Sequence, residues 1–338
     1  MRIALIAPPW APVPPELYGG IELVVDKLAR GFAEAGHDVV LFTTGESTSP
    51  VPRLWDLPLA EGTRIGNSMV ELRHVMAAYT AVGDYDIVHD HTVFGPAYAA
   101  GHGSARVVTT IHGELNADLI PIYDHFARHH TVIAISHAQR KPAPQIPVAR
   151  VIHHGIDAWN FPVGSGDGGY CAFIGRMSDD KGAQRAVMAA HKAGVPIKVA
   201  GKMREPAERD YFETYVAPLL GDGAEYLGEV SHEDKLALLG GACAFLFPIR
   251  WNEPFGLVML ESLACGTPVL AFPEGAAPEV VDDGRTGFLC HDESAMAEAI
   301  GEAAAIDRAT CRAAVEGYFS TERMVREHLD LFADVLGR

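Results

Sequence analysis

Short apolar runs alternate with longer amphipathic stretches along most of the chain, and this alternation restricts the possible folds more than any other feature. In the first half, the apolar runs predict strands, with helices such as 22–35 and 69–82 between them. The predicted strands are 2–7, 37–43, 86–89, 107–111 and 131–135. Strands separated by helices pair in parallel through right-handed crossovers. The pattern therefore predicts an α/β protein with doubly wound parallel sheets.

A second series of apolar runs repeats this alternation in the other half of the chain. Its predicted strands are 170–174, 197–200, 225–227, 244–248 and 269–272. Glycines are dense over 161–169, which predicts a flexible linker between the two series. At 338 residues the chain can form two domains that each bury a core. We expect one domain over 1–163, another over 164–318, and a C-terminal helix over 319–338 that packs back on the first domain.

Composition and charge exclude several classes of protein. The formal net charge of −17 argues against a nucleic-acid partner, and more weakly against anionic membranes, because no basic stripe is available. The five cysteines form no C-x-x-C pair, and four lie in or beside apolar runs, as in a reduced protein. Pro8 and Pro9 end the first apolar run too early for a signal peptide, and no run has transmembrane length. We therefore expect a cytoplasmic protein with at most peripheral membrane contact.

Two carboxylates flank a predicted helix start in the second half of the chain. Glu253 lies in a turn after an apolar run, Gly256 lies in the loop that opens the helix, and Glu261 follows eight residues after Glu253. The N-terminus of a helix presents unpaired N–H groups that suit a phosphate. Eight helical residues span roughly 12 Å, which suits a ligand with hydroxyls at both ends and phosphate between them, such as a nucleotide sugar. The same acids could also stabilise the helix dipole without a ligand.

Two cations lie in the loop that follows the predicted strand 170–174. Arg176 offers a planar fork for a phosphate edge, and Lys181 offers a point charge just before a helix that begins near Gly182. In an acidic chain this pair favours an anion site. A solvated basic turn paired with Asp179 and Asp180 is the alternative.

These motifs together resemble those of the retaining glycosyltransferases of family 4, the glycogen-synthase-like group. The resemblance rests on Gly175-Arg176-x4-Lys181-Gly182, on Glu253-Pro-Phe-Gly-Leu-Val-x-Leu-Glu261 and on the following Ala264-Cys-Gly-Thr-Pro-Val. In the first half, Gly19-Gly20-x-Glu22 looks like the glycine loop of that family, and Thr110-Ile-His112-Gly-Glu resembles its segment around a sugar-proximal histidine. One departure is His154-Gly155-Ile156-Asp157, where the family often has Asn-Gly-x-Asp.

The resemblance implies the GT-B fold, with two Rossmann-like domains facing each other across a cleft, the acceptor on the first and the donor mainly on the second. It implies transfer of a sugar from a nucleoside-diphosphate sugar, UDP-sugar by preference, to a hydroxyl with retention of configuration. His112, Glu253, Arg176 and Lys181 are the implied catalytic residues. Further donor-binding residues are Gly19, Gly20, Gly228, Val230, Pro254, Phe255, Gly256, Leu257, Val258 and Glu261. The acceptor side is assigned Tyr18, His89, His91 and Glu114.

No cofactor or metal is expected. The D-x-D string at Asp84 precedes its strand, so we interpret it as a turn away from the ligand-binding edge. His89 and His91 close the same strand at its C-terminal end and could bind a metal, but no third ligand is obvious. An ordinary core histidine is the alternative for His112. The partners expected are a nucleotide-sugar donor and a small-molecule, glycan or lipid-linked acceptor.

The sequence also bears on three other classes of function. A dehydrogenase is disfavoured, because no G-x-G-x-x-G opens a helix after the first strand, and a proline-rich loop separates that strand from Gly19 and Gly20. A nucleotide-sugar epimerase or phosphorylase could share the same frame. A non-catalytic nucleotide-sugar sensor would bind the donor without turnover.

Overall fold

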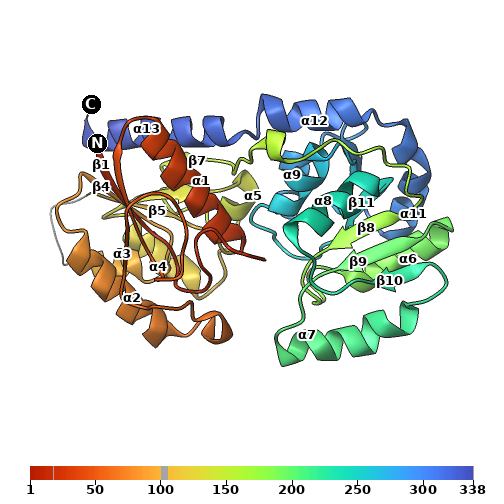
Figure 1. The fold of residues 1–338 in the computed structure, drawn as a ribbon, viewed down its shortest axis with the longest axis horizontal. Coiled ribbons are helices and arrows are strands. Elements are labelled where there is room, and N and C mark those ends of the chain that lie inside the picture. Colours follow the sequence, from red (N-terminus) through yellow and green to blue (C-terminus); the bar gives the residue numbers. More distant parts are fainter. Residues whose placement is uncertain (18, 100–105, 338) are drawn as a thin grey trace. The chain divides into compact units, whose positions relative to one another are not determined.

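The computed structural model describes residues 1–17, 19–99 and 106–337, and these form two compact units, each built on a parallel sheet (Figure 1). Unit 1 consists of Met1–Gly155 with Thr321–Arg338, and unit 2 consists of Ile156–Ser320. The boundary expected from the sequence was at 163, whereas 156–163 belongs to unit 2. Ile156 N–H donates to the carbonyl of Phe319 at 2.9 Å, which ties this segment to the end of the same unit.

The sheet of unit 1 has the order β3-β2-β1-β4-β5-β6-β7 across the residues described. Its strands are β1 (Arg2–Ile6), β2 (Asp38–Thr43), β3 (Arg53–Trp55), β4 (Ile87–Asp90), β5 (Arg106–Thr110), β6 (Thr131–Ala134) and β7 (Arg150–Val151). The helices of unit 1 are α1 (Gly20–Glu34), α2 (Ser68–Ala81), α3 (Gly95–Ala99), α4 (Leu119–Phe126), α5 (His137–Arg140) and α13 (Thr321–Leu336). The sequence pattern did not predict β3 and β7, which are short edge strands.

Side-chain alternation along the central strands divides the core of unit 1 into two faces. Ala4 and Ile6 of β1 pack with Val75 and Ala78 of α2. On the other face, Phe32 of α1 meets Phe332 of α13, with ring centroids 5.4 Å apart. The C-terminal helix α13 therefore completes the core of unit 1.

Unit 2 repeats the doubly wound arrangement with the strand order β10-β9-β8-β11-β12-β13 in its described residues. Its strands are β8 (Cys171–Ile174), β9 (Ile197–Ala200), β10 (Ala224–Tyr226), β11 (Ala244–Phe247), β12 (Val269–Ala271) and β13 (Gly287–Leu289). Its helices are α6 (Ala183–Ala193), α7 (Pro206–Tyr211), α8 (His232–Gly241), α9 (Leu257–Ala264), α10 (Ala277–Val280), α11 (Glu293–Glu302) and α12 (Arg308–Gly317). Cys171 and Phe173 of β8 pack in one core with Val187 of α6 and Met296 of α11.

The glycine-rich segment 161–169, expected to be a flexible linker, is held against unit 2. Gly164 N–H donates to the carbonyl of Cys265, and Gly166 N–H donates to that of Gly240, each at 3.0 Å. A Cβ on Gly164 would lie 2.1 Å from the carbonyl oxygen of Gly240, so the glycine permits close approach of two backbones. The expectation of flexibility was therefore wrong.

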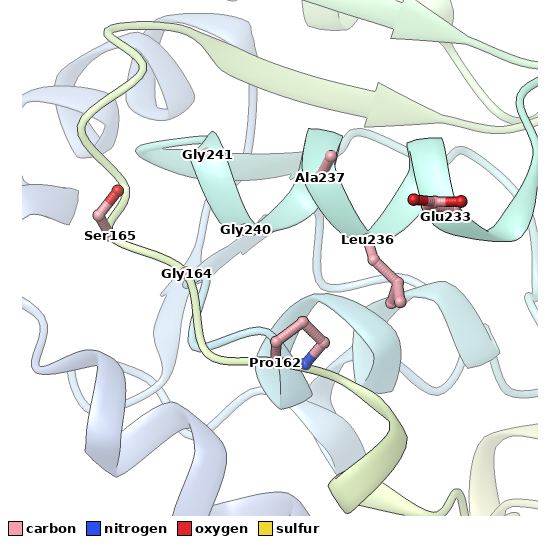
Figure 2. Close-up of a pocket in the computed structure, with 8 residues that line it drawn as sticks. All are labelled: Pro162, Gly164, Ser165, Glu233, Leu236, Ala237, Gly240 and Gly241. Atoms are coloured by element: carbon pink, nitrogen blue, oxygen red, sulfur yellow. The ribbon is translucent and has the colours of Figure 1, made fainter.

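A cavity of about 400 Å³ lies between this segment and α8, and Figure 2 shows Leu236 of α8 pointing toward Pro162. Its lining consists of Pro162, Gly164, Ser165, Glu233, Leu236, Ala237, Gly240 and Gly241. None of the catalytic residues expected from the sequence contributes to it. Among the described helices, none combines the length and the apolar character needed to cross a bilayer.

Candidate active site

Two loops carry most of the charged residues expected from the sequence. Both lie at the edge of the unit 2 sheet that is formed by the carboxyl ends of its parallel strands. Strands β8 and β11 are parallel neighbours, so the loop with Arg176 and Lys181 and the loop with Glu253 begin at the same edge. Gly182 joins the first loop to α6 with a φ of 77°, and a Cβ there would lie 2.5 Å from the carbonyl oxygen of Pro248. A glycine at this position therefore allows the two loops to approach.

Lys181 and Glu253 form an ion pair in which both side chains are largely buried, with 12% and 10% of their surfaces exposed. The indole N–H of Trp251 donates to the same Glu253 Oε2 at 3.0 Å. The Lys181 ammonium also lies 4.5 Å from the centre of the Trp251 ring. Lys181 was expected to contact a phosphate and Glu253 was an implied catalytic residue; in the structure the two side chains bond each other.

Arg185 of α6 clamps the cationic loop to its neighbour. Its side chain is buried, and its Nε donates to the carbonyl of Pro248 at 2.9 Å. The same guanidinium contacts Asp179 through Nη1 at 3.2 Å. Arg185 was not expected from the sequence, because its contact with the carbonyl of Pro248 joins segments 63 positions apart and leaves no local signal.

Arg176 is the more accessible cation of the loop. Its Nη2 lies 3.4 Å from Asp180 Oδ2, and 32% of the Arg176 side chain is exposed. Lys202 follows the neighbouring strand β9, where the N–H of Met177 donates to its carbonyl at 3.4 Å. Burial lowers the pKa of Lys202, and the nearby cations Arg204 and Arg176 lower it further. Cationic side chains thus follow both β8 and β9 at this edge.

Helix α9 begins at Leu257, directly after Gly256, whose φ of 84° is in the left-handed region. No side chain caps this end, and the preceding Phe255 is buried, so the chain is anchored where the first amides of α9 begin. Further along α9, Glu261 accepts from Lys235 Nζ at 2.5 Å. The buried Pro254 and the half-buried Val258 complete the expected loop. Lys235 was not among the expected residues.

The loop expected to contact the base follows β10. Gly228 has a φ of 76°, and its carbonyl accepts from Gly201 N–H at 2.9 Å. Beside it, Glu229 pairs with Arg204 at 3.0 Å, and Val230 is half-buried. These contacts place the loop at the same edge of the sheet as the cationic loop after β8.

In unit 1, His112 follows β5 and His91 follows the neighbouring strand β4. His112 Nε2 lies 2.8 Å from His91 Nδ1, and the His112 ring stacks on His154 with centroids 5.5 Å apart. Burial lowers the pKa of His112 to about 3, with a smaller contribution from His328. His112 is therefore neutral at physiological pH.

The other expected residues of unit 1 differ in their surroundings. His89 is fully buried between α1 and α13, with its ring 5.3 Å from that of Phe332, so it belongs to the core and not to an acceptor surface. Glu114 is half-buried in the loop after His112. Gly19 is the N-cap of α1 and Gly20 its first residue. Tyr18 lies outside the described residues.

No cluster of three or more histidine, cysteine or acidic side chains suited to a metal ion occurs in the part of the chain that the structure describes. Asp84 lies in the turn before β4, as expected, where its carbonyl accepts from Arg2 Nη1 at 2.9 Å. Asp90 is fully buried and accepts from Tyr79 O–H at 2.7 Å.

Two family models match the chain, one in each half. The model described as Glycosyltransferase Family 4 matches residues 18–159, and the model described as Glycosyl transferases group 1 matches residues 157–313. Together they cover most of the chain.

Relatives align along nearly the whole length. A glycogen synthase of Mycobacterium tuberculosis is 28% identical over 89% of this chain and 85% of its own. A phosphatidyl-myo-inositol mannosyltransferase of Mycolicibacterium smegmatis is 26% identical over 89% of this chain and 84% of its own. Among solved structures, AviGT4, a glycosyltransferase involved in avilamycin A biosynthesis, has a TM-score of 0.75 at 25% identity and covers 100% of this chain and 98% of its own. The Anabaena protein HepE, solved with UDP and glucose, has a TM-score of 0.79 at 18% identity over 99% of this chain and 100% of its own.

The chain has two parallel-sheet α/β units, and these motifs lie at the carboxyl ends of their strands. This architecture matches glycosyltransferase structures of the GT-B fold. The first half of the chain matches glycosyltransferase family 4 and the second half matches glycosyl transferases group 1, so the chain belongs to the glycosyltransferases. The fold class expected from the sequence is thereby confirmed.

Proposed function

We propose that this glycosyltransferase moves a hexose from a nucleoside-diphosphate sugar, UDP-sugar by preference, to a hydroxyl acceptor with retention of anomeric configuration. The observation that carries the proposal is the edge of the unit 2 sheet, where Arg176 and the Lys181–Glu253 pair lie on neighbouring loops and α9 begins just after Glu253. HepE was solved with UDP-glucose, which supports a donor of this kind.

The diphosphate is the part of the donor that this edge suits best. Arg176 is exposed enough to reach a ligand, and the amides at the start of α9 favour an anion. Lys181 is held by Glu253, so an arriving phosphate competes for its ammonium or joins it as a further acceptor. Glu253 then gains capacity to accept from a sugar hydroxyl. This exchange would make the charge of Lys181 available as negative charge accumulates on the departing diphosphate.

Other residues are assigned by their chemistry. Glu261 is proposed to accept hydrogen bonds from the ribose hydroxyls, with Lys235 orienting that carboxylate. The loop of Gly228 and Val230 is proposed to hold the base. His112 is proposed to hydrogen-bond a hydroxyl of the donor sugar. Gly19 and Gly20, at the start of α1, are proposed to complete the donor site.

The reaction is proposed to proceed by front-face attack, in which the acceptor oxygen bonds to the anomeric carbon as the bond to the leaving phosphate breaks. The leaving phosphate oxygen takes the acceptor proton. No divalent metal is proposed, because Arg176, Lys181 and the start of α9 supply the positive charge that a metal would otherwise provide. The protein is proposed to act in the cytoplasm on a small-molecule, glycan or lipid-linked acceptor.

Two competing functions use the same binding edge. An epimerase or phosphorylase would consume the donor with water, with phosphate or without any acceptor. A nucleotide-sugar sensor would bind the donor and never consume it.

The first experiment is a thermal-shift panel of nucleoside diphosphates in EDTA. A ligand present at one hundred times its Kd should add about 2.7 kcal/mol to the unfolding free energy, so the preferred base stands out. The same panel with Arg176→Ala should show a much smaller shift. Equal stabilisation of both proteins would remove the phosphate site from the proposal.

A further inference from the structure

His91 and His112 share one hydrogen bond, and the direction of this bond decides what His112 offers to a ligand. The two ring nitrogens, His91 Nδ1 and His112 Nε2, are 2.8 Å apart, so one carries the proton and the other accepts it. Burial lowers the pKa of both rings, so each is neutral and carries a single proton.

The remaining nitrogen of His91 indicates which ring donates. His91 Nε2 is buried and has no hydrogen-bond partner among the described residues. An N–H left there would lose its hydrogen bond to water without compensation, and orphaned buried donors are rarer than under-satisfied acceptors. The single proton of His91 therefore belongs on Nδ1, where it donates to His112. Because His112 Nε2 then accepts, its own proton lies on Nδ1.

We propose that His91 is a positioning residue that fixes His112 in the Nδ1–H tautomer, so that His112 presents an N–H donor and not a lone pair to its ligand. The inference rests on the proposed function, in which His112 contacts a donor-sugar hydroxyl. An N–H group at this position favours a sugar oxygen that accepts a hydrogen bond. The stack of His112 on His154, with 20° between the ring planes, holds the ring that His91 orients.

The loop that carries His91 is itself held by buried carboxylates. Asp90 Oδ1 accepts from the N–H and the hydroxyl of Thr92, both at 2.7 Å. Glu71 of α2 accepts from Val93 N–H at 2.6 Å. The N–H of His91 donates to the carbonyl of Ile6 at 3.0 Å, which continues the pairing of β4 with β1. These bonds fix the backbone on both sides of His91, so its ring can act as a rigid support.

The tautomer can be measured directly by NMR of the wild-type protein labelled with 15N-histidine, in spectra that correlate each ring nitrogen with the carbon-bound protons. His112→Gln identifies the His112 signals by their disappearance. We expect the directly bonded proton on His112 Nδ1. A proton on His112 Nε2 would overturn the inference, whatever the activity of the protein.

Three variants connect the tautomer to catalysis. His91→Leu removes the N–H that bonds His112, and we expect His112 to populate both tautomers. We expect kcat to fall roughly ten- to hundredfold, the range seen when a residue that orients a metal-binding side chain is lost. His91→Asn keeps an amide N–H near the position of Nδ1 and should restore both the tautomer and most of the rate. His74→Leu is the matched control, because it also removes a buried histidine of unit 1 but one that bonds the carbonyl of Ala7.

Unchanged tautomer and rate in a folded His91→Leu would contradict the inference, as would an equal loss of rate in His74→Leu. The failure of the proposed function is distinguishable. If His112 carries its proton on Nδ1 while His112→Gln retains full activity, the assignment of His91 stands and the sugar contact of His112 is wrong.

Discussion

Acidification should destabilise unit 1 strongly, because several of its histidines are buried as neutral rings. Burial lowers the pKa of His74 to about 4, of His112 to about 3 and of His328 to about 4, from the ordinary histidine value of 6.5. Below pH 6.5 the unfolded chain therefore binds protons that the folded unit does not. The unfolding free energy must then fall as the pH is lowered from 6.5 toward the folded pKa values.

The size of the effect follows from these values. The pH of 5 lies 1.5 units below the unfolded pKa of each of the three histidines. This difference lowers the unfolding free energy by about 2 kcal/mol for each histidine, or by about 6 kcal/mol in all. Asp90 acts in the opposite sense, because burial raises its pKa to about 6 and the folded unit takes up its proton first. Its proton uptake stabilises the folded unit by about 1 kcal/mol between pH 6 and pH 5. The net contribution of these four groups, a loss of about 5 kcal/mol, is comparable with the whole stability of a small domain.

The assay is urea denaturation at pH 7 and pH 5, followed by peptide-resolved hydrogen exchange so that each unit reports separately. His74→Gln removes one titrating ring while its amide can still donate to the carbonyl of Ala7, so the loss between the two pH values should shrink by about 2 kcal/mol. His191→Gln, at an exposed position of α6, is the control and should change nothing. Equal stability of unit 1 at both pH values would refute the reasoning. An undiminished loss of unfolding free energy between pH 7 and pH 5 in His74→Gln would also refute it.

Four further outcomes are expected. Glu253→Ala should depress kcat strongly, whereas Glu261→Ala should raise the donor KM more than it lowers kcat, and identical steady-state kinetics would contradict these roles. Arg176→Ala should slow turnover roughly a hundredfold in the same assay; a near-wild-type rate at saturating donor would remove Arg176 from the mechanism. Cys243 should be alkylated first, because its hydrogen bond with the neighbouring Cys171 thiol lowers the pKa of Cys243; mass spectrometry showing another cysteine labelled first would contradict this. Arg308→Ala should lower the urea stability of unit 2 by about 2 kcal/mol, since its guanidinium donates to several backbone carbonyls, and an unchanged midpoint would contradict that.

The alternation of apolar runs and helices predicted both sheets, because strands buried on two faces are continuous apolar segments. It missed β3, β7 and β13, which have two or three residues each and are outermost strands of their sheets. It also misread the segment 161–169, where glycines serve close backbone contact with α8. Composition alone does not distinguish a flexible glycine from one that is packed against another chain segment.

Motif spacing identified the residue types of the candidate site but not their pairing. Lys181 and Glu253 lie 72 positions apart, and only the adjacency of β8 and β11 shows that they form one group. Trp251, two residues before Glu253, had no predicted role, since its contact with Glu253 depends on how the turn folds. His89 was expected on the acceptor side because it ends a strand. In the structure it faces α13, and its ring lies 5.1 Å from that of His328.

The central claim is transfer of a sugar, and the most direct measurement is NMR of the reaction itself. The preferred nucleotide sugar from the thermal-shift panel is incubated in EDTA with a panel of hydroxyl acceptors, and the anomeric signals of donor and product are followed. We predict release of the nucleoside diphosphate together with a new glycoside of the same anomeric configuration. A donor that binds but is never consumed with any acceptor, or is consumed equally without one, would contradict the account. Inverted product, or activity that appears only when magnesium or manganese is added, would contradict the proposed retaining and metal-free mechanism.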